Sequence, residues 1–158
     1  PLPYYEEPAE SPVRTPDVAK EYPFILITGA RFRPMYHSEH RQTGIGMREL
    51  HPEPIVEIHP ETARGIGIRD GDWIWIETRR GRIKQKARLT TAIHPHVVSV
   101  QHGWWFPEKP GEEPYLHGAL QSNSNMLTLD DPETLDPLTG AWSNRALLCK
   151  IYKSLSVL

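Results

Sequence analysis

The chain has 158 residues, 38% hydrophobic and 24% charged, so it is long enough for one buried core and too short for two comfortable domains. A formal net charge of −2 gives no reason to expect a nucleic acid as partner, and a single cysteine excludes a disulfide framework and a cysteine-ligated zinc or iron–sulfur site. The 16 prolines and 11 glycines favour short strands and irregular loops over a helical bundle.

The first 21 residues are rich in proline and glutamate and show no hydrophobic periodicity. We expect residues 1–21 to be an extended linker or arm and residues 22–158 to be the folded domain. No apolar run approaches the ~20 residues that span a bilayer, so we expect no membrane contact from this chain. The start at Pro1 suggests part of something longer, and the compartment is left open between the cytoplasm and export within a longer protein.

The first clear strand runs from Phe24 to Thr28, and Gly29 then permits a turn that other residues resist. The loop that follows, up to Arg41, is long and rich in hydrogen-bonding groups. Long loops without secondary structure of their own are often functional. The candidate donors in this segment are Thr28, Arg31, His37, Ser38 and Arg41.

A strand over 55–58 leads into a helix of about two turns, because Pro60 suits a helix start and Gly65 or Gly67 can end it. A tight turn is expected at 70–72. The aromatic and β-branched run that follows, over 73–78, suits a strand buried on both faces.

After Gly81 the pattern changes to strict alternation. Arg82, Lys84, Lys86 and Arg88 are separated by uncharged residues, which predicts a hairpin arm with one solvated face, and this arm is expected to reach Thr91. Further strands are expected over 97–100 and 146–152, which gives the pattern of a small β-barrel with function placed in its loops.

Three classes of catalytic or metal site find little support. His37 and His40 are spaced i, i+3, but no carboxylate completes an HExxH-type set. There is no GxSxG elbow for a serine nucleophile and no complete phosphate-binding glycine loop. Cys149 lies within an apolar strand, so we interpret it as a buried small hydrophobic residue.

Polar donors in three separate loops remain unexplained by these classes. Besides the loop after the first strand, they are His102 with Trp104 and then Ser122, Asn123, Asn125 and Arg145. Arginine binds phosphate bidentately and asparagine can hydrogen-bond a ring edge, so this mixture suits a large polar ligand with phosphates and heterocycles. It lacks a buried acid–base pair for proton-transfer catalysis.

Four motifs in order, ITGARFRPMYHSEHR, IHPETARGIGIRDGDWIWIETRRGRI, QHGWWFPE and SNSNMLT, resemble the C-terminal domain of the molybdopterin oxidoreductases, the dimethyl sulfoxide reductase family. The resemblance covers Tyr22 to Tyr152. It implies a mainly β fold, a six-stranded double-psi β-barrel with short helices and long loops, that binds molybdopterin guanine dinucleotide. The HGWW form is most similar to acetylene hydratase, formate dehydrogenase and polysulfide reductase-type members.

The resemblance also implies roles for individual residues. The dinucleotide would be held by Thr28, Gly29, Ala30 and Arg31, and one pterin by His37 and Ser38 with Arg41 nearby. The other pterin would be contacted by Asn123 and Asn125, with His102 and Arg145 as further polar positions.

The family's metal ligand and iron–sulfur cysteines are absent from this chain. Molybdenum or tungsten would therefore be held outside it, by remaining domains or a catalytic subunit, with an iron–sulfur protein elsewhere in the complex. We expect the isolated chain to be inactive. The substrate is not indicated by this sequence.

A second hypothesis is a non-enzymatic double-psi barrel module that recognises a protein or peptide. The barrel hairpin suits both hypotheses, because it specifies only the fold. A peptide-binding module would present exposed apolar anchors, whereas the loops here offer polar donors.

Overall fold

The computed structural model describes residues 2, 4–30 and 47–155. Within them, the strands and helices follow the order α1(Pro16–Glu21), β1(Phe24–Ala30), α3(Met47–Leu50), β2(Ile55–Ile58), α4(Pro60–Gly65), β3(Trp73–Glu77), β4(Arg82–Leu89), β5(Val97–Gln101), η1(Leu116–Gly118), α5(Ala119–Ser122), η2(Ser124–Met126), η3(Pro132–Thr134) and β6(Arg145–Lys153).

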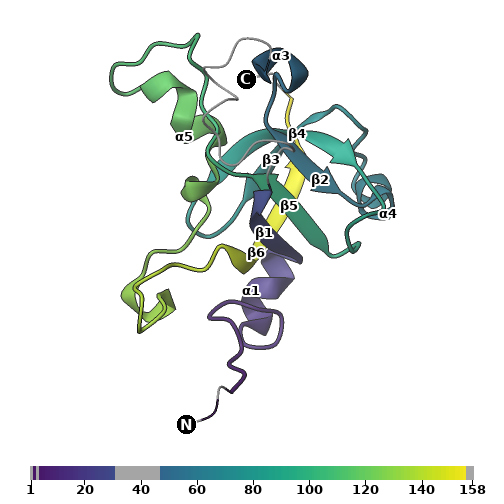
Figure 1. Cartoon of the computed structure of the whole chain (residues 1–158). Coiled ribbons are helices and arrows are strands. Elements are labelled where there is room, and N and C mark those ends of the chain that lie inside the picture. The colour runs from purple at the N-terminus through teal and green to yellow at the C-terminus, as the bar shows by residue number, and fades with distance from the viewer. Residues whose placement is uncertain (1, 3, 31–46, 156–158) are drawn as a thin grey trace.

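The six strands close into one barrel in the order β1-β5-β2-β4-β3-β6 (Figure 1). Two neighbouring pairs are parallel, β1 with β5 and β2 with β4, and the other four are antiparallel. Parallel neighbours require crossover connections, so the two halves of the chain interlock as in a double-psi barrel. The expected six-stranded fold is confirmed, and each predicted strand matches within about two residues at its ends.

The barrel interior is an apolar core to which all six strands contribute. It contains, among others, Leu26, Val56, Ile74, Ile83, Val98 and Cys149, each at most 4% exposed. Alternate residues face the core because side chains on a strand alternate between its two faces. Burial raises the pKa of the Cys149 thiol well above its ordinary value, and nearby Glu10 adds to this, which agrees with a core role for this residue.

One detail of the hairpin differs from the prediction. Strand β3 is not buried on both faces: Ile74 and Ile76 are buried, whereas Trp73 and Trp75 are half-buried on the outer face. On this outer face, Trp75 packs against a charged side chain of the neighbouring strand β4: the Arg82 guanidinium lies 4.5 Å from the Trp75 ring centroid. The large indole is thus covered by a cation rather than by a second apolar layer.

Helix α4 forms as the sequence predicts. Pro60 occupies its first turn, and the Nδ1 atom of His59 accepts a hydrogen bond from the Glu61 amide at 3.2 Å, which caps the helix start. The turn into β3 has Gly71 at φ +80°, a conformation that favours glycine. In Figure 1, α4 and α5 lie on opposite sides of the barrel. We call the end that carries α4 the α4 end, and the opposite end, where β1 and β5 finish and β6 begins, the loop end.

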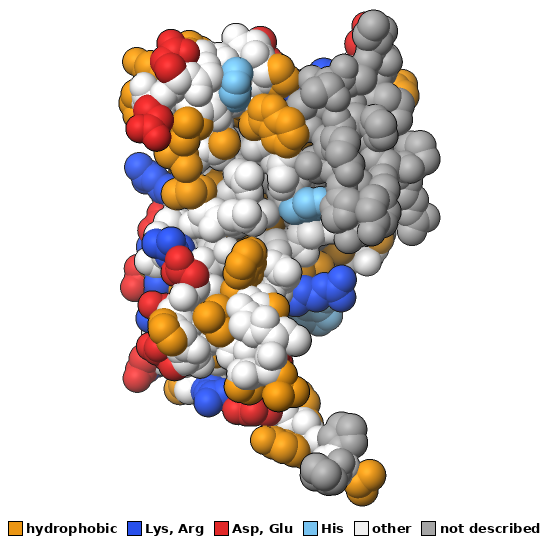
Figure 2. Space-filling view, turned by 60° about the vertical axis from the view of Figure 1, so that its left-hand side comes forward, with side chains coloured by type: hydrophobic (Ala, Val, Ile, Leu, Met, Phe, Trp, Pro, Cys, Tyr) orange, Lys and Arg blue, Asp and Glu red, His pale blue; other side chains and the backbone are white. Residues whose placement is uncertain are grey.

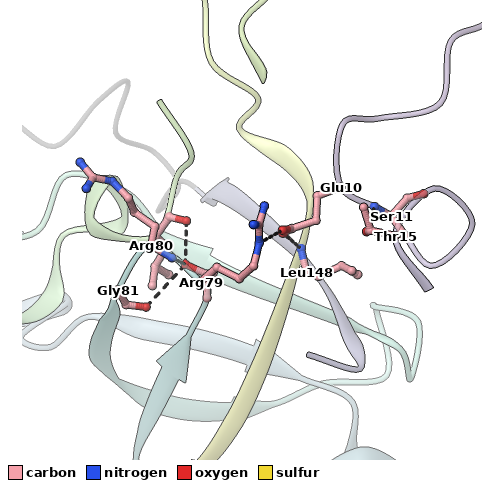
Figure 3. A network of polar contacts seen from close by, with 9 residues as sticks. Glu10, Ser11, Thr15, Arg79, Arg80, Gly81 and Leu148 are labelled. Carbon is pink, nitrogen blue, oxygen red and sulfur yellow. Dashed lines mark hydrogen bonds and ion pairs between the residues drawn. The ribbon is translucent and has the colours of Figure 1, made fainter. Parts of the chain in front are cut away.

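The N-terminal segment packs against the barrel (Figure 3). The Glu10 side chain is 1% exposed; one carboxylate oxygen accepts from Arg79 Nε at 2.7 Å and the other from the Leu148 amide at 2.9 Å. Residues 16–21 form α1, so the segment 1–21 is not extended throughout. Its status as an arm outside a domain at 22–158 stays a prediction.

Glu10 lies where β6 runs past the end of β3. The last residue of β3, Glu77, pairs with Lys150, so Leu148 lies beyond the β3–β6 ladder. An unpaired amide in a buried position costs free energy, and the carboxylate supplies the acceptor that β3 no longer offers. No periodic pattern in the sequence indicates this contact, because it depends on a single residue.

Candidate functional site

Three strand ends meet at the end of the barrel opposite α4. The last residue of β1, Ala30, pairs with Gln101 at the end of β5, and Ile27 pairs with Arg145 at the start of β6. Both the amide and the hydroxyl of Thr28 donate to the Asn144 carbonyl, each at 2.8 Å. The predicted site residues Thr28, Gly29, Ala30, His102 and Arg145 are therefore brought together at this end.

The end of β1 leaves room for a ligand group. Gly29 has φ +88°, is exposed, and a Cβ atom built on it would meet no atom of the described residues within 4 Å. The glycine is therefore required by backbone conformation and not by close packing. Thr28, in contrast, is only 7% exposed and its hydroxyl is already hydrogen-bonded, so its contribution here is to fix the backbone.

The segment that carries Asn123 and Asn125 is fixed to the same end. Ser122, wholly buried, donates from its hydroxyl to the Lys84 carbonyl at 2.8 Å. The Asn123 side-chain oxygen accepts from the Asn125 amide at 3.0 Å and caps the 3-10 helix η2. Asn123 is half-buried, and Asn125, within η2, is exposed. This cap directs the Asn123 side-chain oxygen toward the backbone, so its NH2 group is the donor suited to a ligand.

Lys84 adds a buried cation to this end. We expected a solvated face from Arg82 to Arg88, yet Lys84 is only 6% exposed. Its Nζ lies 5.0 Å from the Trp75 ring centroid, and the segment around Ser122 covers its backbone. Burial, and then the positive charge of Lys109, lowers the pKa of Lys84. An ammonium group in such a place favours a nearby anionic or carbonyl oxygen.

The HGWW segment is packed by cations and aromatic rings. Trp104 is wholly buried, and Trp105 is half-buried, so the two neighbours differ as alternation predicts. The Arg48 guanidinium of α3 lies 5.1 Å from the Trp104 ring centroid and forms an ion pair with Glu108 at 2.8 Å. This pairing ties α3 to the segment that follows His102.

Four predicted site residues, Arg31, His37, Ser38 and Arg41, lie outside the described residues. Among the described ones, no group of three or more His, Cys, Asp or Glu side chains could hold a metal ion. Over the same ranges, every helix is too short or too polar to cross a bilayer.

Sequence reasoning missed a set of buried polar side chains at this end. Gln85 is wholly buried, and Gln101 and His51 are 4% and 3% exposed. A signal was present: Gln85 occupies an inward position between Ile83 and Ala87, where the alternation calls for an apolar residue. A polar residue at a core position must find hydrogen bonds, so it marks a specific structural role.

Comparison with known proteins assigns the family. Residues 24–145 match the family model described as "Molydopterin dinucleotide binding domain". The chain is 39% identical over 155 residues to acetylene hydratase of Syntrophotalea acetylenica, covering 97% of this chain and 21% of that protein. It is 42% identical over 153 residues to dopamine dehydroxylase of Eggerthella lenta, covering 97% of this chain and 14% of that protein.

Two further relatives agree with these. The formate dehydrogenase alpha subunit of Megalodesulfovibrio gigas is 30% identical over 190 residues, covering 98% of this chain and 17% of that subunit. The solved structure of acetylene hydratase from Pelobacter acetylenicus superposes with a TM-score of 0.89 at 38% identity, over 97% of this chain and 21% of that one. The chain thus spans about a fifth or less of the length of these relatives.

These matches confirm the resemblance, the barrel fold and the cofactor class expected from the sequence, molybdopterin guanine dinucleotide. They favour a cofactor-binding part of an enzyme over the alternative of a peptide-recognition module. The chain belongs to the molybdopterin dinucleotide-binding domain family of the molybdenum and tungsten enzymes.

Proposed function

We propose that this chain holds molybdopterin guanine dinucleotide at the loop end of its barrel, within a molybdenum or tungsten oxidoreductase whose metal ligand lies on other domains or a separate catalytic subunit. An iron–sulfur protein elsewhere in the complex would exchange electrons with it. When bound, the cofactor carries the metal at which the redox chemistry occurs, and the protein supplies binding and orientation.

The observation that carries the proposal is the convergence at one barrel end. The ends of β1 and β5, the start of β6 and the Asn123 segment are joined there by strand pairing and hydrogen bonds. The donor set also suits the cofactor: arginines for the diphosphate, amides for the pterin and guanine edges, and an open Gly29 for close backbone approach.

In detail, the last residues of β1 (Thr28, Gly29, Ala30) and Arg31 after them would hold the dinucleotide part. His37, Ser38 and Arg41 would contact one pterin, and Asn123 and Asn125 the other. His102 and Arg145 would add polar contacts at the same mouth. Because Thr28 already donates to Asn144, its role would be to set the path of the β1 backbone.

The surface around this end also suits contact with the rest of an enzyme. Figure 2 shows hydrophobic side chains exposed in separate groups over the face that carries α5. Leu120, within α5, is 49% exposed, Tyr115, four residues before α5, is 57% exposed, and Trp142 is 45% exposed. Exposed large hydrophobic residues in groups are typical of surfaces that meet other domains or subunits.

The test is cofactor content in the complete enzyme. Arg31→Ala and Asn125→Ala should each lower the amount of cofactor per folded protein, because each removes a side chain that would contact it. Arg64→Ala, in α4 at the opposite end, is the matched control and should leave cofactor content unchanged. Equal cofactor content in Arg31→Ala, Asn125→Ala and the parent protein would count against these assignments.

A further inference from the structure

Gln85 makes an unusual set of contacts across the barrel interior. Its side-chain NH2 donates to the Gln101 carbonyl at 2.9 Å and to the Ser122 carbonyl at 3.2 Å, and its oxygen accepts from the Gln101 amide at 3.1 Å. Both amide protons and the oxygen are thus used. A wholly buried glutamine is stable only when its amide is satisfied in this way.

These bonds replace a missing strand partner. Gln85 lies on β4 and Gln101 on β5, and the two strands are separated by β2. The β2–β5 ladder runs only from Ile58↔Val98 to Val56↔Val100, so the backbone of Gln101 lies beyond it. The Gln85 amide binds both the N–H and the C=O of Gln101, much as the next residue of a strand would.

Gln101 extends the contacts toward α3. Its side-chain oxygen accepts from the Ile55 amide at 2.8 Å, and its NH2 lies 2.6 Å from Nε2 of His51. Because the backbone amide of Ile55 can only donate, the oxygen of Gln101 is assigned to it and the NH2 faces the imidazole. His51 Nε2 is therefore the acceptor of this bond. We refer to His51, Gln85, Gln101 and Ser122 as the Gln85 relay.

The relay joins residues that directly precede proposed cofactor ligands. Gln101 is followed by His102, and Ser122 is followed by Asn123. Resting on the function proposed above, we propose that Gln85 is a positioning residue that sets the spacing between these two loops and thereby the geometry of the cofactor site. It acts through backbone groups and does not itself contact the cofactor.

Stability alone does not account for a glutamine at position 85. A leucine or methionine at this inward position would fit between Ile83 and Ala87 and would avoid the cost of burying an amide. The amide is bonded instead to two carbonyls and one N–H on segments distant in sequence. A fully satisfied buried polar group of this kind specifies one arrangement of the chain.

The decisive variant is Gln85→Met in the complete enzyme, since methionine keeps the length and loses the hydrogen bonds. Prepared without cofactor, the variant should show faster backbone hydrogen exchange at Gln101 and over 123–127, with Ile74 to Ile76 unchanged. Its affinity for added molybdopterin guanine dinucleotide should fall roughly 10–100-fold, the range seen when groups that orient ligand-contacting residues are removed.

Two variants control this experiment. Ile83→Val removes one methylene from the adjacent inward position, so it should lower stability without changing cofactor affinity. Gln101→Met removes only the side-chain contacts with His51 and Ile55, so it should weaken cofactor binding less than Gln85→Met does. If Gln85→Met does not fold, the cofactor affinity of Gln101→Met is measured in its place.

The outcomes separate the two proposals. If the parent protein itself does not bind the cofactor, the proposed function fails. If the parent binds and Gln85→Met binds within about two-fold of it, the positioning role is overturned. Faster exchange across the whole barrel, with the same affinity loss in Ile83→Val, would also overturn it, because the effect would then be general destabilisation.

Discussion

The two ends of the barrel are built differently. At the α4 end, the side chains buried in the core are apolar, among them Ala63 and Ile68, whereas Asp70 is exposed and Asp72 half-buried. These two aspartates accept backbone hydrogen bonds from Leu89 and Arg69 respectively. At the loop end, buried apolar side chains such as Trp104 are accompanied by buried polar ones, Gln85, Gln101 and Ser122, which bind backbone groups of long and irregular segments. The same closed sheet thus joins an end organised by packing to an end organised by hydrogen bonds.

This difference separates stability from binding. Apolar contacts are not directional, so the α4 end tolerates changes of shape that keep volume. Hydrogen bonds fix distances and angles, so the loop end can hold a polar ligand in one position. The following substitutions test whether the two roles can be changed independently.

The largest loss of stability is expected in the core beside α4. Ile58 is wholly buried at the end of β2, and Ile58→Ala should lower the free energy of unfolding by about 2–5 kcal/mol. Cofactor content per folded molecule should stay constant. Denaturant unfolding and cofactor assay of the soluble fraction check this, with Ile66→Ala, 39% exposed, as the control. Loss of cofactor from folded Ile58→Ala would contradict the separation of the two ends.

The second largest loss of stability is expected when the contacts of Glu10 with the barrel are removed. Glu10→Ala leaves the Leu148 amide and Arg79 without their carboxylate, and should lower the free energy of unfolding by about 1.5–3 kcal/mol. Glu10→Gln keeps an oxygen that can accept from Leu148 and should lose less. Proteolysis of the segment before Phe24 should become faster in Glu10→Ala. Equal melting temperatures for all three proteins would show that the contact does not stabilise the fold.

An element of this fold can be predicted from the sequence when the residues that specify it lie close together in the chain. The strands follow from alternation and from aromatic and β-branched runs, and α4 from Pro60 and its glycines, because these signals are local. Helices α1, α3 and α5 have 4–6 residues, too few for periodicity to show. They depend on tertiary contacts instead, such as the ion pair between Arg48 of α3 and Glu108.

The site was predictable in part. The loops after β1 and around Asn123 carry local polar signals, and family-like motifs give their roles. The Gln85 relay depends on which strands become neighbours, which one sequence does not specify. The strand β6 was predicted, but the irregular register at its start was not: the register shifts between Leu26 and Ile27, Ala146 has φ +61°, and Arg145 lies opposite Ile27.

A smaller change at the loop end should affect binding more than stability. Gly29→Ala adds a methyl group in open space but at φ +88°, and should cost about 1–2 kcal/mol of backbone strain. Cofactor content should fall further than stability explains, since the methyl group occupies the space beside the end of β1. Gly65→Ala, at the end of α4 with no positive φ, is the control and should be neutral or slightly stabilising. Full cofactor content in Gly29→Ala would argue against close approach at this glycine.

The smallest expected effect is the contribution of Asp72, at the α4 end, to the pH dependence of the free energy of unfolding. A hydrogen bond from Lys153, and then one from the Arg69 amide, holds the pKa of Asp72 below its ordinary 3.8. The ionised form therefore stabilises the fold above that value, and this contribution is lost as the pH falls below it. Asp72→Asn and Lys153→Met should each lower the free energy of unfolding by roughly 1 kcal/mol or less at pH 7. Both variants should also lose less stability than the parent protein when the pH is lowered from 7 to 3. Unfolding at pH 7 and pH 3 measures this, and parallel profiles for variant and parent would contradict it.

The closure of the six strands also determines how this chain can meet its neighbours. In the described barrel each strand is hydrogen-bonded on both sides, so no row of backbone donors and acceptors is left to recruit a strand from another polypeptide. Association must then proceed through side chains and loop backbones, whose identity can vary while the sheet stays the same. The same barrel can in this way associate with different partners when only its loops and surface side chains change.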